Sequence, residues 1–523
     1  MFKYKHKAIS AILLTSLGAV SICSCNIGSD PINDPTLPTT ESISTSMTTY
    51  ETSEETTAET SAETTAASES GTYETAPEST GINTDFVRTA DYVTPEMMTP
   101  DFWIREEDNR ILMTDEQIKV FNYENRVHVK SDDGVEMPYF DEFEDTFDGD
   151  ILRLILWDNA KAAPKDPSQY YLDGTRTTRA YWNELIELSN IDAVPEEIEV
   201  QYGFTVKRMT LRMYPTEDRV FSDPYDRLFD FNLYSECMPY MPVYVLHESS
   251  DGEYYYVVFD SFASWVRKDA VALCEDKEDW LERQNPDNWL TVTAREIRLG
   301  DDPYSDATSN LVLPMGTKME LVTAEDAPDI VSERTTFGDY VVKVPTRGSD
   351  GYVEDEYVLI PVSDDVTVGY LPYTSANVVR QALKLQGDRY GWGGDLRAND
   401  CTGIVREIYR CFGILMPRVG QSDVTGVYWV DLSDMSEEEK LEELDKLSPG
   451  SLVSFPGHMT IYLGTVDDIP YVISAVGTFV APAGYSTEVL HPRSVVISSL
   501  YVRNRSFTPW LHLAKTALTI KPE

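Results

Sequence analysis

Apolar residues are distributed unevenly along the 523 residues of the chain. Between residues 26 and 83, Thr, Ser, Glu and Ala dominate and few apolar residues are larger than alanine, so this stretch is expected to be a disordered tether. From Asp85 onward apolar residues return in helical and strand patterns, and the length predicts several domains. Short apolar or alternating runs between turn residues predict β-strands at 205–211, 242–247, 254–259, 311–317, 340–345, 357–361 and 458–463.

A helix is predicted to begin at Cys401, shortly after a glycine-rich turn. Residues 390–394 read Tyr-Gly-Trp-Gly-Gly, and Ile404, Val405, Ile408 and Phe412 then form one apolar helical face. Cys401 therefore sits at the N-terminus of this helix, where the helix dipole favours an anion and makes the thiol easier to ionise. A thiolate is a nucleophile that needs a base nearby in space.

A strand with alternating residue types is predicted to begin at His458. Met459, Ile461 and Leu463 share one face, while His458, Thr460 and Tyr462 share the other. On that second face an imidazole is able to meet Cys401, although the alternation alone favours a structural histidine.

Several motifs, in order and at sensible spacing, together resemble the NlpC/P60 family of cysteine peptidases. The similarity covers about residues 373–513 and rests on Tyr-Gly-Trp-Gly-Gly (390–394), Asp-Cys-Thr-Gly (400–403), Met-Pro-Arg (416–418), Leu-Ser-Pro-Gly (447–450) and Gly-His-Met (457–459). It implies an α+β protein with a papain-like catalytic domain. It also implies cleavage of peptidoglycan stem peptides, typically between γ-D-glutamate and a diamino acid.

The resemblance assigns roles to individual residues. Cys401 matches the nucleophile, His458 the general base, and Tyr390 a tyrosine whose hydroxyl helps the Cys401 N–H to form the oxyanion pocket. The third polar residue, which orients the imidazole, is usually a histidine, but the matching position here holds Ser474. A serine stabilises an imidazolium less than an acid or a second histidine does, and His491 is an alternative third residue.

Further positions are implied to bind substrate. Asp400 and Thr402 flank the nucleophile, where the family holds the amino end of the substrate, and Trp392 is assigned to the same group. No cofactor is expected. The six histidines are scattered without a His-Glu-x-x-His motif, so metal hydrolysis is disfavoured.

The rest of the folded chain resembles the accessory parts of such peptidases. An N-terminal stabilising segment, mostly helical or irregular, is expected at 84–200, two SH3-like β-barrels at 201–284 and 285–366, and the catalytic domain at 367–517. Thr114 and Gln117 predict a helix capping box, and Trp103 is interpreted as a packing residue. Short linkers favour barrels that pack on the catalytic domain and restrict it to small soluble muropeptides.

The N-terminus predicts export. A basic start and an apolar run too short to span a membrane comfortably are followed by Ile-Cys-Ser-Cys (22–25), which resembles a lipoprotein signal over residues 1–25. Cys25 is the expected lipidated residue and Cys23 the alternative. Two acyl chains on Cys25 would anchor an extracytoplasmic lipoprotein to the membrane at the cell wall; an ordinary secretory signal is the other interpretation.

Charge and cysteine content narrow the function. A net charge of −46 disfavours a nucleic-acid partner. Cys411 is too far along the helix from Cys401 for a disulfide and is predicted to be buried, whereas Cys237 and Cys274 are left open as a pair. The preferred hypothesis is an endopeptidase acting on peptidoglycan stem peptides. The alternatives are an amidase or acyltransferase on the same scaffold and a catalytically weakened, SH3-bearing wall-binding lipoprotein.

Overall fold

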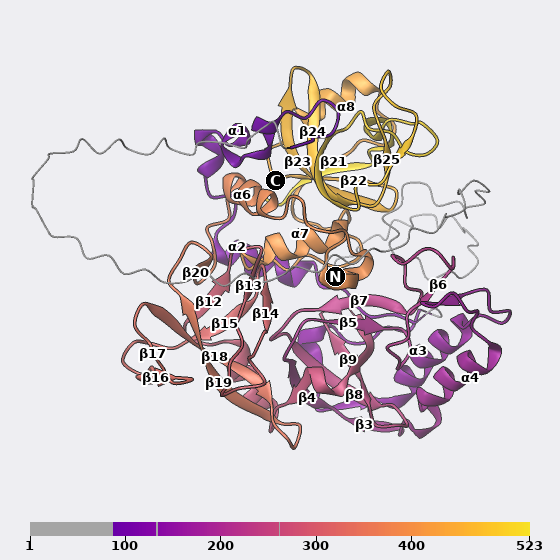
Figure 1. The fold of residues 1–523 in the computed structure, drawn as a ribbon, viewed down its shortest axis with the longest axis vertical. Helices are drawn as coiled ribbons and strands as arrows, with labels where there is room; N and C mark the ends of the chain where they lie inside the picture. The colour runs from indigo at the N-terminus through magenta and orange to yellow at the C-terminus, as the bar shows by residue number, and fades with distance from the viewer. Residues whose placement is uncertain (1–86, 132–133, 261, 523) are drawn as a thin grey trace, which may run out of the picture. The chain divides into compact units, whose positions relative to one another are not determined.

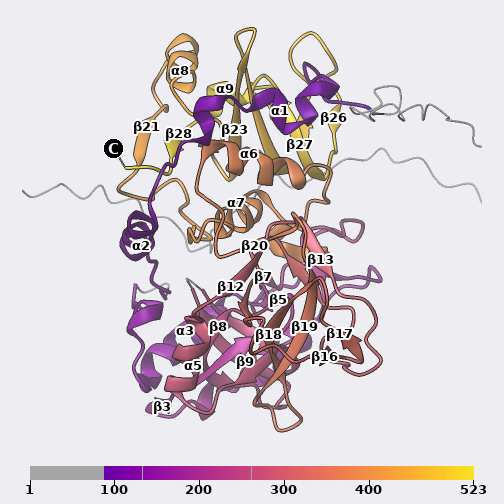
Figure 2. The same cartoon turned by 90° about the vertical axis from the view of Figure 1, so that its left-hand side faces the viewer.

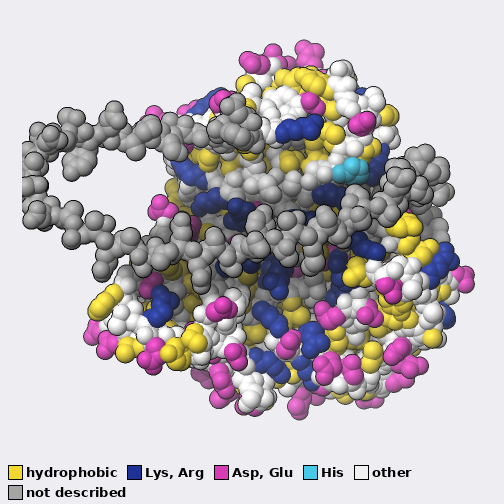
Figure 3. Space-filling view, viewed as in Figure 1, with side chains coloured by type: hydrophobic (Ala, Val, Ile, Leu, Met, Phe, Trp, Pro, Cys, Tyr) yellow, Lys and Arg dark blue, Asp and Glu magenta, His cyan; other side chains and the backbone are white. Residues whose placement is uncertain are grey.

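The computed structural model describes residues 87–131, 134–260 and 262–522. The predicted signal, tether and lipidation site at Cys25 lie outside these residues. In the described part of the chain, no helix combines the length and the apolar character needed to cross a membrane. Side chains on the face shown in Figure 3 are not evenly mixed: visible Lys and Arg gather across the middle, and Asp and Glu are spread around the periphery.

The first part of the expected N-terminal segment packs against the C-terminal domain. Trp103 is buried, donates from Nε1 to the carbonyl oxygen of Met97 at 2.7 Å, and packs on Tyr471 with ring centroids 5.6 Å apart. Trp103 is thus a packing residue, as predicted. Thr114 and Gln117 form the predicted capping box. The helical elements here are η2 (Pro95–Met98), α1 (Pro100–Trp103), η3 (Glu106–Asn109) and α2 (Asp115–Glu124).

The second part of that segment belongs to a different hydrophobic core. Phe147, Leu152 and Leu156 cluster with Tyr202 and Trp265 of the following β-sheet. The expected single segment, 84–200, is therefore divided between two cores, because the apolar faces of its helices meet different partners. The elements are η4 (Phe140–Glu142), β1 (Thr146–Asp148), α3 (Gly149–Ala162), β2 (Tyr170–Tyr171), α4 (Arg179–Leu188), η5 (Ile191–Ala193) and β3 (Glu197–Glu199).

A seven-stranded antiparallel sheet follows, in the order β11-β4-β8-β9-β10-β5-β7, and is called the first β-domain below. Cys237 and Cys274, which the sequence left open as a disulfide pair, are both free, buried and in separate hydrophobic clusters. The elements are β4 (Gln201–Thr205), β5 (Met209–Arg212), β6 (Val220–Phe221), β7 (Leu233–Cys237), β8 (Pro242–Glu248), β9 (Tyr254–Phe259), β10 (Phe262–Arg267), η6 (Lys268–Ala270), β11 (Val271–Leu273) and α5 (Lys277–Gln284).

The second β-domain is built on a five-stranded antiparallel sheet in the order β19-β18-β15-β12-β20. Its own core contains Leu290, Met319, Val342 and Ile360. The strands are β12 (Trp289–Val292), β13 (Glu296–Arg298), β14 (Val312–Pro314), β15 (Lys318–Leu321), β16 (Ile330–Val331), β17 (Arg334–Thr335), β18 (Asp339–Arg347), β19 (Val353–Pro361) and β20 (Val366–Val368).

The C-terminal domain has a six-stranded sheet in the order β21-β28-β22-β23-β24-β27. Strand β28 runs to Thr519, past the expected end of the domain at 517, because it pairs with both β21 and β22. The elements are α6 (Ser375–Lys384), η7 (Trp392–Arg397), α7 (Cys401–Arg410), β21 (Tyr428–Asp431), α8 (Glu437–Leu444), β22 (Leu452–Phe455), β23 (His458–Val466), β24 (Ile469–Val476), β25 (Phe479–Val480), β26 (Val489–Leu490), β27 (Ser494–Ser499), α9 (Trp510–Leu513) and β28 (Thr516–Thr519).

Helix α7 is the central element of this domain. It packs against β23 and β24 on one side and lies between the C-terminal sheet and the first β-domain (Figure 1, Figure 2). Its residues Ile404, Val405 and Ile408 are buried in one core with the β23 residues Met459 and Ile461. The predicted apolar face of the helix is therefore the face that fixes it on the sheet.

Candidate active site

Cys401 is the first residue of α7, and Asp400 caps the helix. The Asp400 Oδ1 accepts a hydrogen bond from the Gly403 N–H at 2.9 Å, and Oδ2 accepts one from the Gly393 N–H at 2.9 Å. One carboxylate thus ties the start of the helix to the glycine turn before it. Cys401 itself is fully buried, at the position where the helix dipole is most positive.

The glycine turn lies directly against the first β-domain. Gly394 has φ +90°, and a Cβ atom there would lie 2.5 Å from the Cβ and Cγ of Glu236 on β7. At Gly393 a Cβ would lie 3.0 Å from Leu233 on the same strand. Only glycine permits both this left-handed backbone and this approach, so the turn sequence also encodes the docking of β7.

Arg418 completes the arrangement around Asp400. Its guanidinium donates to both carboxylate oxygens of Asp400, with Nη1 to Oδ1 at 2.7 Å, and also to the Thr402 hydroxyl. Burial raises the pKa of Asp400, but the charge and hydrogen bonds of Arg418 outweigh burial, so the pKa lies below its ordinary value. The Arg418 Nε reaches Ser235 of the first β-domain at 3.3 Å.

These contacts bear on the predicted substrate-binding residues. Asp400 and Thr402 are buried, and their side-chain oxygens are engaged with Arg418, with each other and with backbone N–H groups. The geometry thus gives both residues a positioning role, and contact with substrate stays a prediction. In the sequence Arg418 stands out only as part of the Met-Pro-Arg motif, and the signal for its role is an arginine that follows a proline in an apolar stretch.

Tyr390 and Trp392 precede Gly393 and Gly394 in the glycine turn. Tyr390 is buried, forms a parallel β-bridge with Asn399, and donates its N–H to the Arg493 carbonyl at 2.8 Å. Trp392 is largely buried, and its ring packs edge-on against Phe229 of the first β-domain, with ring centroids 5.9 Å apart. The oxyanion role of Tyr390 and the substrate role of Trp392 stay predictions.

His458 is the first residue of β23 and is held from two sides. Its Nε2 lies 3.2 Å from the Ser474 Oγ on β24, and its ring packs edge-on against Trp510 at 5.0 Å. Its Nδ1 makes no hydrogen bond to the residues that the structure describes. In the tautomer with the proton on Nε2, this N–H donates a hydrogen bond to the Ser474 Oγ and the lone pair is on Nδ1. This is the neutral tautomer that a general base acting through Nδ1 requires.

The electrostatic environment keeps His458 neutral. Burial lowers its pKa from 6.5 to about 3, and the nearby charge of Asp400 opposes this shift only in part. Helix α7, which begins after Asp400, packs against β23. Residues Met459, Ile461 and Leu463 face the α7 core while Tyr462 faces the opposite core, so the predicted alternation is correct although both faces are buried. The face that packs on the α7 core is thus not the one expected to carry His458 to Cys401, because the His458 ring packs on Trp510 of the opposite core. Contact between His458 and Cys401 stays a prediction.

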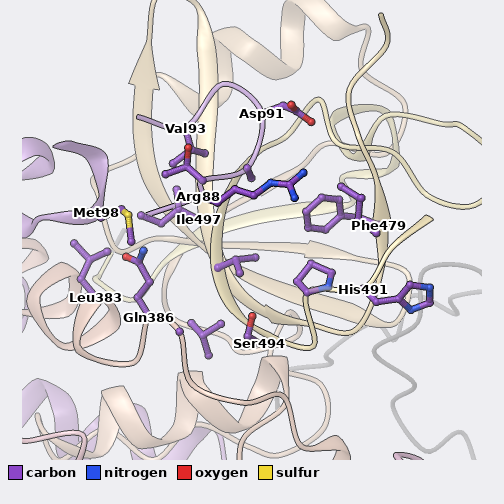
Figure 4. Close-up of a pocket in the computed structure, with 17 residues that line it drawn as sticks. Arg88, Asp91, Val93, Met98, Leu383, Gln386, Phe479, His491, Ser494 and Ile497 are labelled. Carbon is purple, nitrogen blue, oxygen red and sulfur yellow. The ribbon is translucent and has the colours of Figure 1, made fainter. Parts of the chain in front are cut away.

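His491, the alternative third residue, lies elsewhere. It lines a cavity of about 700 Å³ between residues 88–98, the end of α6 and β27. Figure 4 shows its ring pointing away from that cavity, which is also lined by Arg88, Phe479 and Ser494. Ser474 is therefore the residue that contacts His458. Cys411 is buried, as predicted, and the described ranges hold no cluster of His, Cys, Asp and Glu able to bind a metal ion.

Comparisons with known proteins agree with this fold. Residues 387–490 match the NlpC/P60 family model, and residues 219–267 match the model of an SH3 domain of the SH3b1 type. The chain thus contains an NlpC/P60 domain, formed by the C-terminal domain, and an SH3 domain within the first β-domain. No curated protein matches the sequence significantly.

Three solved structures are similar to parts of the chain. An NlpC/P60 endopeptidase from Photobacterium damselae subsp. piscicida is 18% identical with a TM-score of 0.62, covering 81% of this chain and 97% of that one. The peptidoglycan hydrolase RipB from Mycobacterium tuberculosis is 21% identical (TM-score 0.18, 28% of this chain and 65% of that one). NlpC1 from Trichomonas vaginalis is 15% identical (TM-score 0.21, 58% and 93%). The first likeness shows that most of the chain shares the fold of that endopeptidase.

Proposed function

We propose that this chain is a cysteine peptidase of the cell wall that hydrolyses the bond between γ-D-glutamate and a diamino acid in peptidoglycan stem peptides. The observations that carry the proposal are the position of Cys401 at the capped N-terminus of α7, the packing of α7 on β23, and a neutral His458 that is held by Ser474 at the start of β23. Their pairing as nucleophile and base is part of the proposal. Its occurrence in an NlpC/P60 domain, and the similarity in fold to an endopeptidase, support the same reaction class.

In the proposed reaction the Sγ of Cys401 attacks the carbonyl carbon of the γ-D-glutamyl residue. The thiol proton passes to Nδ1 of His458, and the developing oxyanion is bound by the Cys401 N–H and the Tyr390 hydroxyl. His458 then returns the proton to the leaving amine as the C–N bond breaks. Water, activated by the same imidazole, hydrolyses the thioester and releases the peptide carboxylate.

The first β-domain is proposed to limit the size of the substrate. Leu233 and Glu236 pack on the glycine turn that precedes Cys401, and the ring of Phe229 packs edge-on against Trp392. A site walled in this way favours small soluble muropeptides with a free amino end over the intact wall. The predicted lipid anchor at Cys25 would place this activity outside the cytoplasm, at the membrane beneath the cell wall.

The test uses the full chain and its Cys401→Ala variant with L-Ala-γ-D-Glu-diaminopimelate and the N-acetylated peptide, with products identified by mass spectrometry. Release of free diaminopimelate from the unblocked peptide alone, by the wild type alone, is the expected result. Cleavage of both peptides would contradict the restricted site. Equal release by Cys401→Ala would contradict the assigned nucleophile.

The alternative functions give different products. An amidase would release alanine or another capping group instead of diaminopimelate, and an acyltransferase would form a new amide when an amine acceptor is added. A wall-binding protein without catalysis would leave both peptides intact and sediment with purified sacculi equally well as wild type and as Cys401→Ala.

A further inference from the structure

A buried arginine of the first β-domain reaches the backbone just before the nucleophile. Arg208, one residue before β5, donates from Nη2 to the Ala398 carbonyl at 3.1 Å and to the Asn399 Oδ1 at 3.3 Å. Asp400 and Cys401 follow immediately. Because consecutive Cα atoms are only about 3.8 Å apart, a shift at residues 398–399 is transmitted directly to the start of α7.

The same guanidinium is held by two carboxylates. Its Nε donates to the Glu236 Oε2 at 2.8 Å, and its Nη1 lies 3.7 Å from the Glu407 Oε1 on α7. The other oxygen of Glu407 accepts a hydrogen bond from the Asn399 Nδ2 at 2.7 Å. The contacts form a closed circuit from β7 through Arg208 to residues 398–399, and from there to the second turn of α7.

This circuit is buried on all sides. The exposed side-chain fractions are 8% for Arg208, 8% for Glu236 and 2% for Glu407. Burial raises the pKa of Glu407 to about 7, against the opposing charge of Arg208. Arg208 is thus the cation that balances Glu236 and limits the cost of burying Glu407. Glu236 also forms the wall against Gly394, so the circuit and the glycine turn share a side chain.

We propose that Arg208 is a positioning residue for Cys401: the first β-domain sets the geometry of the nucleophile through the contacts of this side chain with residues 398–399. The inference rests on the proposed function for its kinetic readout. Under this proposal the first β-domain does more than limit the size of the substrate, because it is also necessary for the rate of the chemical step.

The chemistry of arginine explains why this residue type is needed. Its planar guanidinium donates in several fixed directions at once, here to a carboxylate, a backbone carbonyl and an amide oxygen. A lysine keeps the charge that balances Glu236 but has a single ammonium group, which cannot hold all three acceptors in the same geometry. The Arg208→Lys variant therefore loses the positioning contacts while it keeps the charge that balances Glu236.

The experiment compares Arg208→Lys, Arg208→Gln and the double variant Arg208→Gln/Glu236→Gln in the full chain. The double variant removes both charges of the buried pair and keeps the interface neutral if Arg208→Gln alone does not fold. Lys207→Gln is the matched control, because Lys207 is adjacent, exposed and paired with Asp269 of its own domain. The readouts are kcat and KM for L-Ala-γ-D-Glu-diaminopimelate, and the rate at which iodoacetamide alkylates Cys401 in reduced protein.

Arg208→Lys is expected to lower kcat by about tenfold to a hundredfold with little change in KM, since a misplacement of about 1 Å can cost about a hundredfold. The folded Gln variants should lose at least as much, and Lys207→Gln should behave as the wild type. Wild-type kcat in folded Arg208→Lys and in the double variant would overturn the proposal, as would an equal loss in Lys207→Gln.

The alkylation rate separates this inference from the proposed function. If the wild type does not cleave the tripeptide, the proposed function fails, yet the alkylation of Cys401 still reports its position. Slower alkylation in Arg208→Lys than in Lys207→Gln then supports positioning. Equal alkylation rates in the wild type, Arg208→Lys and the double variant reject it.

Discussion

The Oγ atom of Ser474 lies 3.2 Å from Nε2 of His458, within hydrogen-bond distance across neighbouring strands. If His458 acts as the proposed base, a hydroxyl takes the orienting position that an acid or a second imidazole fills in other triads. Ser474 fixes the direction of the ring, and with it the orientation of Nδ1, but it adds no charge to stabilise an imidazolium.

Ser474→Ala is expected to lower kcat by about fivefold, because a neutral hydrogen bond contributes about 1 kcal/mol. The packing of Trp510 on the ring should preserve most of its orientation, so the enzyme is expected to stay active. Steady-state kinetics on the tripeptide measure the effect. Ser498→Ala, which removes a buried hydroxyl from the neighbouring strand β27, is the control, and an equal loss there would contradict a specific role for Ser474.

Arg418→Gln is expected to destabilise the fold by about 3–5 kcal/mol, because it leaves the buried carboxylate of Asp400 without its cation. Asp400→Asn keeps a helix-capping side chain but removes the negative charge opposite Arg418. The double variant should be more stable than the sum of the single losses predicts. Urea unfolding of all four proteins measures the coupling between the two residues, and strictly additive losses would contradict a paired function.

Gly394→Ala is expected to weaken the docking of β7 and to reduce activity. Its added Cβ meets Glu236 and its backbone is left-handed, with φ +90°. Gly484→Ala is a matched control, since Gly484 has φ +92° but no atom within 4 Å of its Cβ position. Both variants carry the backbone cost, which is on the order of 1–2 kcal/mol, so the excess loss in Gly394→Ala, measured by thermal unfolding and by kcat, reports the clash. Equal losses of stability and kcat in the two variants would show that β7 shifts to accommodate the added Cβ without cost.

The buried imidazole predicts a loss of stability in acid. Because burial lowers the pKa of His458 to about 3, the unfolded chain binds this proton more tightly than the folded protein does. The stability contributed by the neutral ring is present above its ordinary pKa of 6.5 and decreases as the pH falls toward 3. The loss is at most about 1.4 kcal/mol per pH unit.

Unfolding of His458→Gln should accordingly depend less on pH over this window than unfolding of the wild type. Thermal unfolding at about pH 7.5 and about pH 5 compares the two proteins. His512→Gln serves as the control, because His512 is exposed and bonded to Glu437 at the surface. An unchanged pH dependence in His458→Gln would contradict a buried neutral imidazole.

Much of the candidate site followed from patterns that extend over a few residues. The i, i+4 spacing of apolar residues after Cys401 places the cysteine at a helix start, and the structure has that helix at Cys401–Arg410, with Asp400 as its cap. The alternation after His458 correctly predicted which residues of β23 share a face, and the two faces lie in two different cores. The capping box at Thr114 formed for the same reason. Periodicity and capping depend on neighbours along the chain, so the sequence alone determines them.

The tertiary structure decided the contacts that join distant segments. Arg418 meets Asp400 across 18 positions, and Arg208 meets Ala398 across 190. Neither pair has a periodic signal, because each depends on how whole elements dock and on which buried charges then need a partner. The division of the N-terminal segment between two cores has the same origin, since an apolar helical face specifies burial but not the surface that buries it. The sequence by itself therefore predicted Cys401 and His458 as the proposed nucleophile and base, and only the packed structure determined what holds them in place.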